Sequence, residues 1–411
     1  MPKILVGLER GIVPSNTPSS IVARVQIIPS ENGKQVIQKN TEHFILLDNS
    51  GSMFGSKLDQ AKDALIKYCK SINQQDKITI ATFSNQVNVI AKNLPVSEMP
   101  VEKLIKNVTV EGGTYMYAAL SLMYNMIESL KRDVPKSAGS ESYKIILLTD
   151  GVPSDGSDNE FIQISTKFSM LGVPMYILGI GEDYNEDLLL HMYQANEIGF
   201  FKHITNSEDI TNTFSDLSKE IILYPSRELN IKITPGTKII KVYKYEPQIL
   251  ELGPRKISEN TYVIPLGNIG TDKQTILIKM EIPQRPTGEY REGLFSIELD
   301  TSLTAPLIIK RSEDLNDIKQ SLDSDIKAQF TEADINIHAL RAMDKTNVNS
   351  EKEKEIFTKR LEEIQKDNIM TQKLGTKVQE LVETQKIMNG TKKVSEEELK
   401  ERKSGLTKKR D

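Results

Sequence analysis

The sequence lacks features that would point to several classes of protein. Its 411 residues include a single cysteine, Cys69, which excludes an internal disulfide and a cysteine-rich zinc site. No stretch approaches the ~20 apolar residues that a membrane-spanning helix needs. The apolar part of the first ten residues is too short for a secretory signal. We therefore expect a cytoplasmic protein without an integral membrane segment.

The chain also lacks an excess of positive charge. Its 53 Lys and Arg residues face 57 Asp and Glu residues, for a formal net charge of −4. No global field would attract phosphate, which argues against a nucleic-acid-binding protein. The hydrophobic fraction of 38% is low for one large globule. At ~150 residues per domain, the length favours two or three domains, one part well packed and another highly charged.

Periodicity divides the chain into three kinds of region. Residues 21–29 alternate with period two and predict a strand, followed by a turn at Asn32 and Gly33 and a further strand at 36–38. From about Glu42, short apolar runs typical of buried strands alternate with helical stripes. Alternating strands and turns return after Pro225, and the final part is helical and charged.

These patterns predict a doubly wound α/β domain with a mostly parallel sheet over residues 41–223. The strands of 1–40 and 224–308 are expected to form one β-sandwich, into which the α/β domain is inserted. Residues 309–411 predict a charged helical tail, most simply a solvated hairpin or bundle.

Polar loops flank the predicted strands of the α/β domain. The segment 48–52 (Asp-Asn-Ser-Gly-Ser) follows one apolar strand, 149–151 (Thr-Asp-Gly) follows another, and 112–114 (Gly-Gly-Thr) precedes a helix. A doubly wound sheet brings such loops to one edge. We therefore expect five oxygen-bearing side chains to converge there: Asp48, Ser50, Ser52, Thr114 and Asp150.

This set contains oxygens but no sulfur or imidazole, which favours a hard cation such as Mg²⁺, with Mn²⁺ or Ca²⁺ as alternatives. If the hydroxyls bind directly and the carboxylates stay further out, the metal remains electron-poor and attracts an anionic oxygen from a partner. The simpler interpretation, in which Asp48 and the serines cap the next helix, explains one residue but not the set.

The three motifs together resemble the von Willebrand factor A domain. Asp-x-Ser-x-Ser after a strand, Thr in a Gly-Gly-Thr loop and a strand-ending Thr-Asp-Gly match that family's metal-ion-dependent adhesion site at all five positions, within a resemblance over about 42–223. The resemblance implies that Ser50, Ser52 and Thr114 coordinate the metal directly, with Asp48 and Asp150 acting mainly through water.

The wider arrangement is similar to prokaryotic intracellular proteins in which such a domain is flanked by a β-sandwich and a helical tail. The segment 393–400 resembles the closing helix of that tail.

The leading hypothesis is a Mg²⁺-dependent interaction module or scaffold, not an enzyme, that binds an Asp or Glu side chain of a partner protein. Its expected partner-binding rim is Gly113, Tyr115 and Met116, although Tyr and Met at a helix start are equally typical of a core. One alternative is a phosphatase-like hydrolase with Asp48 as nucleophile, disfavoured because Ser50 stands where a second Asp is needed. Another is a scaffold that acts through its helical tail.

Other polar residues are less informative. Asp155, Asp158, Glu182 and Asp183 also follow strand ends, and indicate either a second cation site or a solvated acidic rim. The segment 51–57, which ends at Lys57, lacks the spacing of a phosphate-binding loop.

Overall fold

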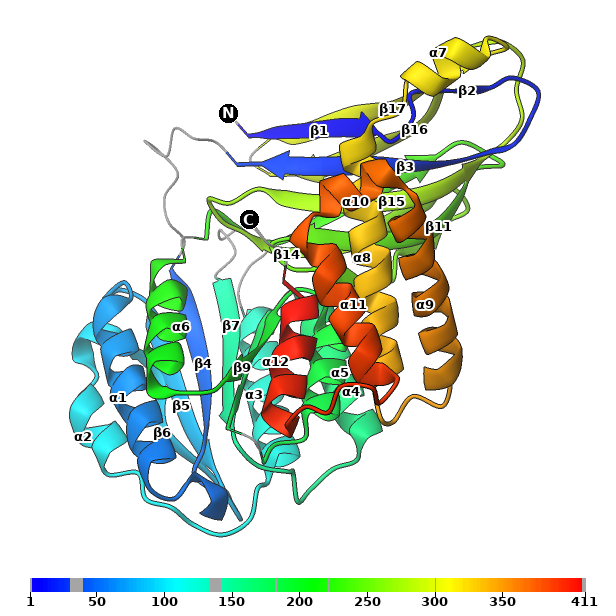
Figure 1. The fold of residues 1–411 in the computed structure, drawn as a ribbon. Coiled ribbons are helices and arrows are strands. Elements are labelled where there is room, and N and C mark those ends of the chain that lie inside the picture. Colours follow the sequence, from blue (N-terminus) through cyan, green and yellow to red (C-terminus); the bar gives the residue numbers. More distant parts are fainter. Residues whose placement is uncertain are drawn as a thin grey trace. The chain divides into compact units, whose positions relative to one another are not determined.

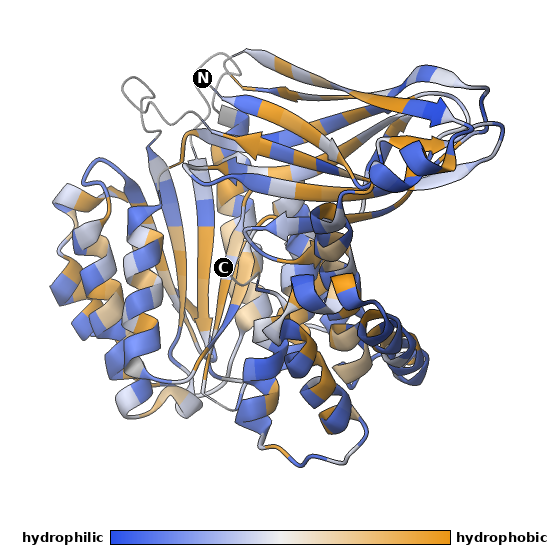
Figure 2. Ribbon diagram, turned by 45° about the horizontal axis from the view of Figure 1, so that its top comes forward, coloured by the Kyte–Doolittle hydropathy of each residue, from blue (hydrophilic) through white to orange (hydrophobic). Residues whose placement is uncertain are grey.

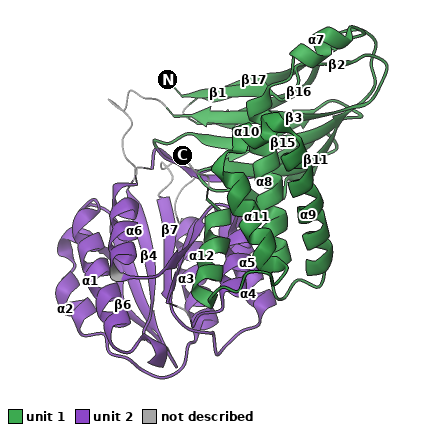
Figure 3. Ribbon diagram, in the orientation of Figure 1, with its two compact units in different colours: residues 1–33, 228–264, 271–411 green, residues 34–227, 265–270 purple. Residues whose placement is uncertain are grey.

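A computed structural model of the protein describes residues 2–29, 40–133, 142–181, 183–220, 222–299 and 301–408. The predicted turn at Asn32 and Gly33, the strand at 36–38 and Glu182 lie outside the described residues. The chain forms two compact units (Figure 3). Unit 1 comprises residues 1–33, 228–264 and 271–411, and unit 2 comprises 34–227 and 265–270.

Unit 2 is an α/β domain. Its strands are β4 (Thr41–Asp48), β5 (Lys77–Phe83), β6 (Val87–Pro95), β7 (Ser142–Thr149), β8 (Met175–Ile180) and β9 (Phe200–Ile204). Its α-helices are α1 (Ser56–Ser71), α2 (Val101–Lys106), α3 (Met116–Asp133), α4 (Asp158–Met170), α5 (Glu186–Asn196) and α6 (Ser207–Lys219). Two 3₁₀ turns, η1 (Gly51–Met53) and η2 (Val96–Glu98), complete it.

The sheet of unit 2 has the order β6-β5-β4-β7-β8-β9, and every neighbouring pair except β5 and β6 is parallel. β4 lies in the middle, where Ile45 pairs with Ile80 on one side and Ile146 on the other. β4 and β7 are buried along their whole length, because helices cover both faces of the sheet (Figure 1). The predicted doubly wound, mostly parallel fold is confirmed.

The helix α1 shows how the sequence pattern becomes packing. Its predicted stripe is buried and joins the cluster that contains Ile45 and Leu47 of β4. Cys69 lies on this stripe with none of its surface exposed, and burial raises the pKa of its thiol to about 12. Cys69 therefore acts as a small buried hydrophobic residue.

Unit 1 contains most of two further sheets. The first residues of β10 and the last residues of β14 belong to unit 2. The strands are β1 (Lys3–Leu8), β2 (Ile12–Pro14), β3 (Ser19–Ile28), β10 (Tyr224–Ile233), β11 (Lys238–Glu246), β12 (Leu250–Glu251), β13 (Arg255–Ser258), β14 (Thr261–Ile269), β15 (Gln274–Ile282), β16 (Gly288–Glu298) and β17 (Ser302–Ser312). One sheet has the order β1-β3-β15-β11-β12 and is antiparallel; the other is β13-β14-β10-β16-β17-β2, with β2 parallel to β17.

The N-terminal strands share these sheets with strands that follow residue 224. Val25 of β3 pairs with Ile276 of β15, and Val13 of β2 pairs with Arg311 of β17. Along β17 the even-numbered residues from Thr304 to Ile308 are partly or fully exposed, while Ala305, Leu307 and Ile309 are buried. This alternation gives the sheet one buried face, as a period-two pattern predicts (Figure 2).

The C-terminal part of unit 1 is helical, as predicted. It contains α7 (Leu315–Gln320), α8 (Ser324–Met343), α9 (Ser350–Lys366), α10 (Asn368–Leu374), α11 (Thr376–Met388) and α12 (Glu396–Leu406). None of the described helices combines the length and apolar character needed to cross a membrane.

The expectation of a solvated helical tail is wrong for α8. Residues 332–340 are all buried, and the hydroxyls of Tyr243 and Tyr245 on β11 donate hydrogen bonds to Asp334 and Glu332, each at 2.7 Å. Although the tail is charged overall, its helix α8 packs against the sheet that contains β11. The residues from 309 onward belong to the same compact unit as that sheet.

A buried histidine links β4 to α1 inside unit 2. His43 is 1% exposed, with Nδ1 2.7 Å from the Tyr68 hydroxyl and Nε2 3.0 Å from Asp76 Oδ2. Burial lowers the pKa of His43 to about 4, although Asp76 opposes this shift. The imidazole is therefore neutral at pH 7 and takes part in a hydrogen-bonded chain within the core.

This neutral histidine predicts acid sensitivity. Below pH ~6.5 the unfolded chain gains a proton at His43 while the folded protein does not, so the free energy of unfolding falls from pH 6.5 toward pH 4. The loss between pH 7 and pH 5 should be about 2 kcal/mol. Urea titrations at both pH values should show this loss, and His43→Gln should remove it. An unchanged loss in the variant would contradict the assignment.

Candidate metal centre

The five predicted oxygen-bearing residues lie at one edge of the unit 2 sheet. Asp48 is the last residue of β4, and Asp150 follows the last residue of β7. These two strands are parallel neighbours in which Leu47 pairs with Leu148, so their carboxyl ends meet at the same edge. Ser50 and Ser52 lie in the turn around η1, and Thr114 stands two residues before α3.

The three hydroxyls lie close together beside a glycine. Ser50 Oγ and Ser52 Oγ are 3.1 Å apart. The residue facing them is Gly151, and a Cβ at this position would lie 3.3 Å from Ser52 Oγ, 3.3 Å from Thr114 Oγ1 and 3.6 Å from Ser50 Oγ. Glycine at 151 therefore keeps open the point toward which the three oxygens converge.

Two buried carboxylates stand behind the hydroxyls. Asp48 and Asp150 have no exposed surface. Asp48 Oδ1 accepts a hydrogen bond from the Ser50 amide at 2.8 Å, and Oδ2 accepts one from the Thr149 hydroxyl at 2.6 Å. Asp150 Oδ1 accepts one from Ser52 Oγ at 2.7 Å. Burial raises the pKa of Asp48, while its hydrogen bonds from Ser50 and Thr149 oppose that rise.

Lys57, near the start of α1, is a member of the site that the sequence analysis missed. Its Nζ donates to Asp150 Oδ2 at 2.7 Å and lies 3.2 Å from Asp183 Oδ2. Partial burial acts to lower the pKa of Lys57, but the two carboxylates raise it above its ordinary value, so the ammonium stays charged. No spacing in the sequence relates Lys57 to Asp150, since the pair forms only when α1 packs beside the end of β7.

Hydrogen bonds donated by backbone amides connect the loops of the site to one another. The Glu111 amide donates to the Asn49 carbonyl at 2.8 Å, which joins the Gly-Gly-Thr loop to the turn after β4. Thr114 exchanges two bonds with Ser154: its amide donates to Ser154 Oγ at 2.8 Å, and its carbonyl accepts from the Ser154 amide at 3.0 Å. Gly113 has φ +76° and a Cβ there would lie 3.2 Å from Asn85 Cα, so this position requires glycine.

The predicted rim is only partly at the surface. Gly113 is exposed, and Tyr115 has 40% of its surface exposed. The prediction for Met116 is wrong, because α3 begins at this residue and buries it completely. The sequence indicated both core and rim for a methionine at a helix start, and packing selects the core.

The other acidic residues have local roles. Asp155 accepts hydrogen bonds from the Tyr117 and Ala118 amides at 3.0 and 2.8 Å, and thereby caps the start of α3. Asp158 is exposed in the first turn of α4, and Asp183 faces Lys57. Within the described ranges, no group of three or more His, Cys, Asp or Glu side chains is arranged to hold a metal ion.

The oxygen set itself suits a divalent ion. Three neutral hydroxyls around an open point, backed by two buried carboxylates, are the donors that a hard cation such as Mg²⁺ accepts. Ser50, Ser52 and Thr114 would hold the ion, with the charges of Asp48 and Asp150 behind them. The residues therefore fit the group that the sequence analysis expects.

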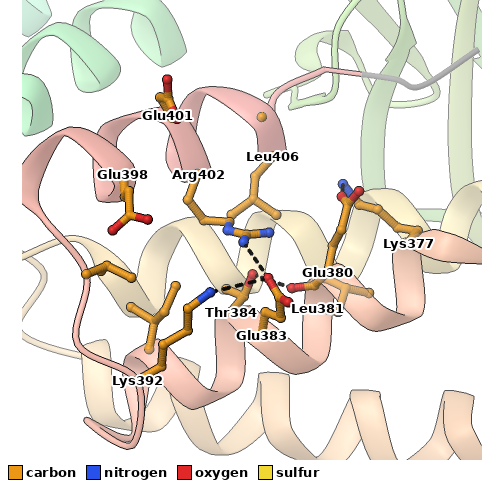
Figure 4. A pocket seen from close by; sticks show the side chains of 13 residues that line it. Lys377, Glu380, Leu381, Glu383, Thr384, Lys392, Glu398, Glu401, Arg402 and Leu406 are labelled. Carbon is orange, nitrogen blue, oxygen red and sulfur yellow. Dashed lines mark hydrogen bonds and ion pairs between the residues drawn. The ribbon is translucent and has the colours of Figure 1, made fainter.

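Unit 1 has a hollow of a different character between α11 and α12 (Figure 4). Leu381 and Leu406 contribute apolar surface to it, while Lys392 and Arg402 both pair with Glu383, at 3.6 and 3.0 Å. Its charged groups are of both signs, and they do not form a site comparable to the oxygen cluster of unit 2.

Comparisons with known proteins agree with the α/β fold of unit 2. Residues 44–219 match the family described as the von Willebrand factor type A domain. An uncharacterized protein of Synechocystis sp. is 24% identical over 266 residues, which cover 62% of this chain and 60% of that protein. Inter alpha-trypsin inhibitor, heavy chain 4, of Mus musculus is 29% identical over 182 residues, which cover 43% of this chain and 19% of that protein.

A solved structure described as von Willebrand factor type A from Catenulispora acidiphila has the same fold. It superposes with a TM-score of 0.78 at 16% sequence identity, covering 100% of this chain and 97% of that one. Residues 44–219 thus form a von Willebrand factor type A domain, within the limits of about 42–223 that the motifs indicate. The chain accounts for 60% of the length of the Synechocystis relative and 19% of the mouse one.

The Lys57–Asp150 pair predicts a stability effect. Lys57→Met leaves a carboxylate with no exposed surface without this cation, and should lower the free energy of unfolding by roughly 2 kcal/mol. The loss stays below that of a fully buried pair because 29% of the Lys57 side chain is exposed. Urea unfolding of the metal-free protein measures this loss in the free energy of unfolding. Lys67→Met, at an exposed position on the same helix, is the control, and equal stability of the two variants would contradict the prediction.

Proposed function

We propose that unit 2 is a Mg²⁺-dependent protein-interaction module that binds an acidic side chain of a partner protein. The observation that carries the proposal is the convergence of the hydroxyls of Ser50, Ser52 and Thr114, all within 3.6 Å of the position that a Cβ on Gly151 would occupy. Mn²⁺ or Ca²⁺ would use the same oxygen chemistry. The domain type supports this proposal, since such domains commonly mediate interactions between proteins.

The charges of the site support an anionic partner group. Asp48 and Asp150 are both buried, and Lys57 offsets one of their two negative charges. Asp183, which also faces Lys57, is exposed and its charge is screened by solvent, so a divalent ion would leave the buried part of the site with about one positive charge, because the hydroxyls that hold it are neutral. In a partly desolvated edge this charge attracts a carboxylate, which can also supply the oxygen that completes the coordination of the ion.

We propose that this chemistry is binding and not catalysis. Both oxygens of Asp48 already accept hydrogen bonds, from the Ser50 amide and the Thr149 hydroxyl, and its side chain has no exposed surface. These contacts suit a group that orients the loop and balances the ion better than they suit the nucleophile of a hydrolase. The single cysteine, Cys69, is unpaired, which fits our further proposal of a cytoplasmic location.

Substitution at Gly151 should block the ion without unfolding the domain. The φ of Gly151 is not positive, so Gly151→Ala is compatible with its backbone, but the methyl group occupies the space among the hydroxyls. Calorimetric titration with MgCl₂ should show binding to the wild type and an affinity at least about tenfold lower for the variant, a change of ~1.4 kcal/mol.

Gly112→Ala is the matched control, since a Cβ at Gly112 meets no atom within 4 Å and its φ is not positive either. It should bind Mg²⁺ as the wild type does. Equal Mg²⁺ affinity of Gly151→Ala and Gly112→Ala would show that the ion does not occupy the hydroxyl cluster.

The function itself is tested by affinity capture from a lysate of the native cells, read by mass spectrometry. The full chain in Mg²⁺ should retain a partner that is lost in EDTA and lost again in Mg²⁺ with Gly151→Ala, while Gly112→Ala retains it. Thr114→Ala, which removes one hydroxyl ligand, should weaken the capture. The same proteins in every condition would mean that binding does not use the metal site.

A further inference from the structure

We propose that the partner presents its acidic residue between apolar side chains, which dock on three exposed hydrophobic residues around the candidate metal centre. These residues, here called the apolar rim, are Phe54, Tyr115 and Val152. The proposal rests on the proposed function, because it describes the surroundings of the carboxylate that the metal would bind.

Each residue of the apolar rim comes from a different loop of the site. Phe54 stands two residues after Ser52, Tyr115 directly follows Thr114, and Val152 directly follows Gly151. Consecutive Cα atoms are ~3.8 Å apart, so the three Cα atoms lie within roughly 10 Å of the hydroxyl cluster. The apolar rim therefore lies within the footprint of a peptide segment whose carboxylate reaches the hydroxyls.

The exposure of these side chains is high for their size. Phe54 is 80% exposed, Val152 58% and Tyr115 40%. Within the part of unit 2 that the structure describes, the other exposed large hydrophobic residues are Val89 on β6 and Met170 at the end of α4. Single exposed hydrophobic residues are ordinary, but one on each of three converging loops indicates a surface that a partner covers.

The apolar rim is held in place before any partner binds. The Tyr115 amide donates to the Ser84 carbonyl at 2.7 Å, and the Phe54 amide donates to the Gly51 carbonyl at 3.3 Å. The loop of Val152 is joined to that of Tyr115 by the two bonds between Thr114 and Ser154. Because the backbone is already fixed, a partner spends little free energy on ordering these loops.

These features define the partner segment. Its carboxylate reaches the ion, and hydrophobic side chains on the same side of the segment cover the apolar rim. In an extended chain, residues two positions apart point to the same side and are ~6.6 Å apart, which lies within the bound of roughly 10 Å between the hydroxyl cluster and the Cα atoms of the apolar rim. We therefore expect Asp or Glu in an extended segment with apolar residues two positions before and after it.

The experiment measures the fluorescence polarisation of labelled peptides with the full chain, in Mg²⁺ and in EDTA. The probes are Gly-Leu-Ser-Asp-Ser-Leu-Gly, the unflanked Gly-Ser-Ser-Asp-Ser-Ser-Gly and the uncharged Gly-Leu-Ser-Asn-Ser-Leu-Gly. The flanked Asp peptide should bind in Mg²⁺ but not in EDTA, about tenfold or more tightly than the unflanked one. The Asn peptide should not bind.

Protein variants assign this preference to the apolar rim. Phe54→Ser and the triple variant with Tyr115→Ser and Val152→Ser should lose most of the preference for leucine flanks while their calorimetric affinity for Mg²⁺ stays unchanged. Met170→Ser is the matched control, since Met170 is 65% exposed but lies at the far end of α4 from the loop that follows β7. It should retain the full preference.

The failures of the two proposals are distinguishable. Equal Mg²⁺-dependent affinity for flanked and unflanked Asp peptides, or a preference that survives in Phe54→Ser and the triple variant, would overturn the role of the apolar rim and leave the proposed function standing. If Mg²⁺ binds but no Asp peptide does, or if the Asn peptide binds as well as the Asp peptide, recognition of a carboxylate itself is wrong and both proposals fall.

Discussion

The parallel pairing of β4 with β7 is the constraint on which the site depends. Both strands are buried along their whole length, and the match of Leu47 with Leu148 brings the residues that follow to one edge of the sheet. A shift of β4 by one residue would turn Ile45 and Leu47 away from the cluster that they form with α1 and toward the opposite face of the sheet, so the packing of this cluster favours the observed register. Asp48 and Asp150 are thus positioned by the core of the domain. Ser50 and Ser52 follow because their turn starts at the same edge, and the loop of Thr114 is joined to that turn by the hydrogen bond from the Glu111 amide to the Asn49 carbonyl.

Burying two carboxylates next to each other is unfavourable without compensation, and the structure supplies it from several directions. Asp48 accepts hydrogen bonds from Ser50 and Thr149, and Asp150 accepts them from Ser52 and Lys57. The compensation is incomplete in charge, because among the described residues the ammonium of Lys57 is the one cation paired with Asp150 and it is shared with the exposed Asp183, while Asp48 accepts its hydrogen bonds from neutral groups. The remaining negative charge, together with the space kept open by Gly151, is the physical reason that the site is suited to a cation.

Strand pairing between segments that are distant in the sequence also explains how one chain forms two units. β3 pairs with β15, and more than two hundred residues separate the two strands, as in the pair of Val25 with Ile276. The intervening α/β sequence has its own buried strands and its own hydrophobic cluster around Ile45 and Leu47, so it forms a separate compact unit between segments of the other.

Much of this could be predicted from local patterns. Apolar runs such as 44–47 identify buried parallel strands, and the polar residues directly after them meet at one edge, so Asp48, Ser50, Ser52 and Asp150 were predictable as a group. Thr114 follows no strand directly, and its motif before a helix was the signal that added it to the group. Three features were decided only by tertiary structure. Lys57 reaches Asp150 because of how α1 packs, Met116 turns into the core although it stands beside the site, and α8 is buried against β11 despite the charged sequence around it. Local sequence encodes strands, turns and the chemistry of their ends, whereas contacts between residues distant in the chain depend on packing that no spacing records.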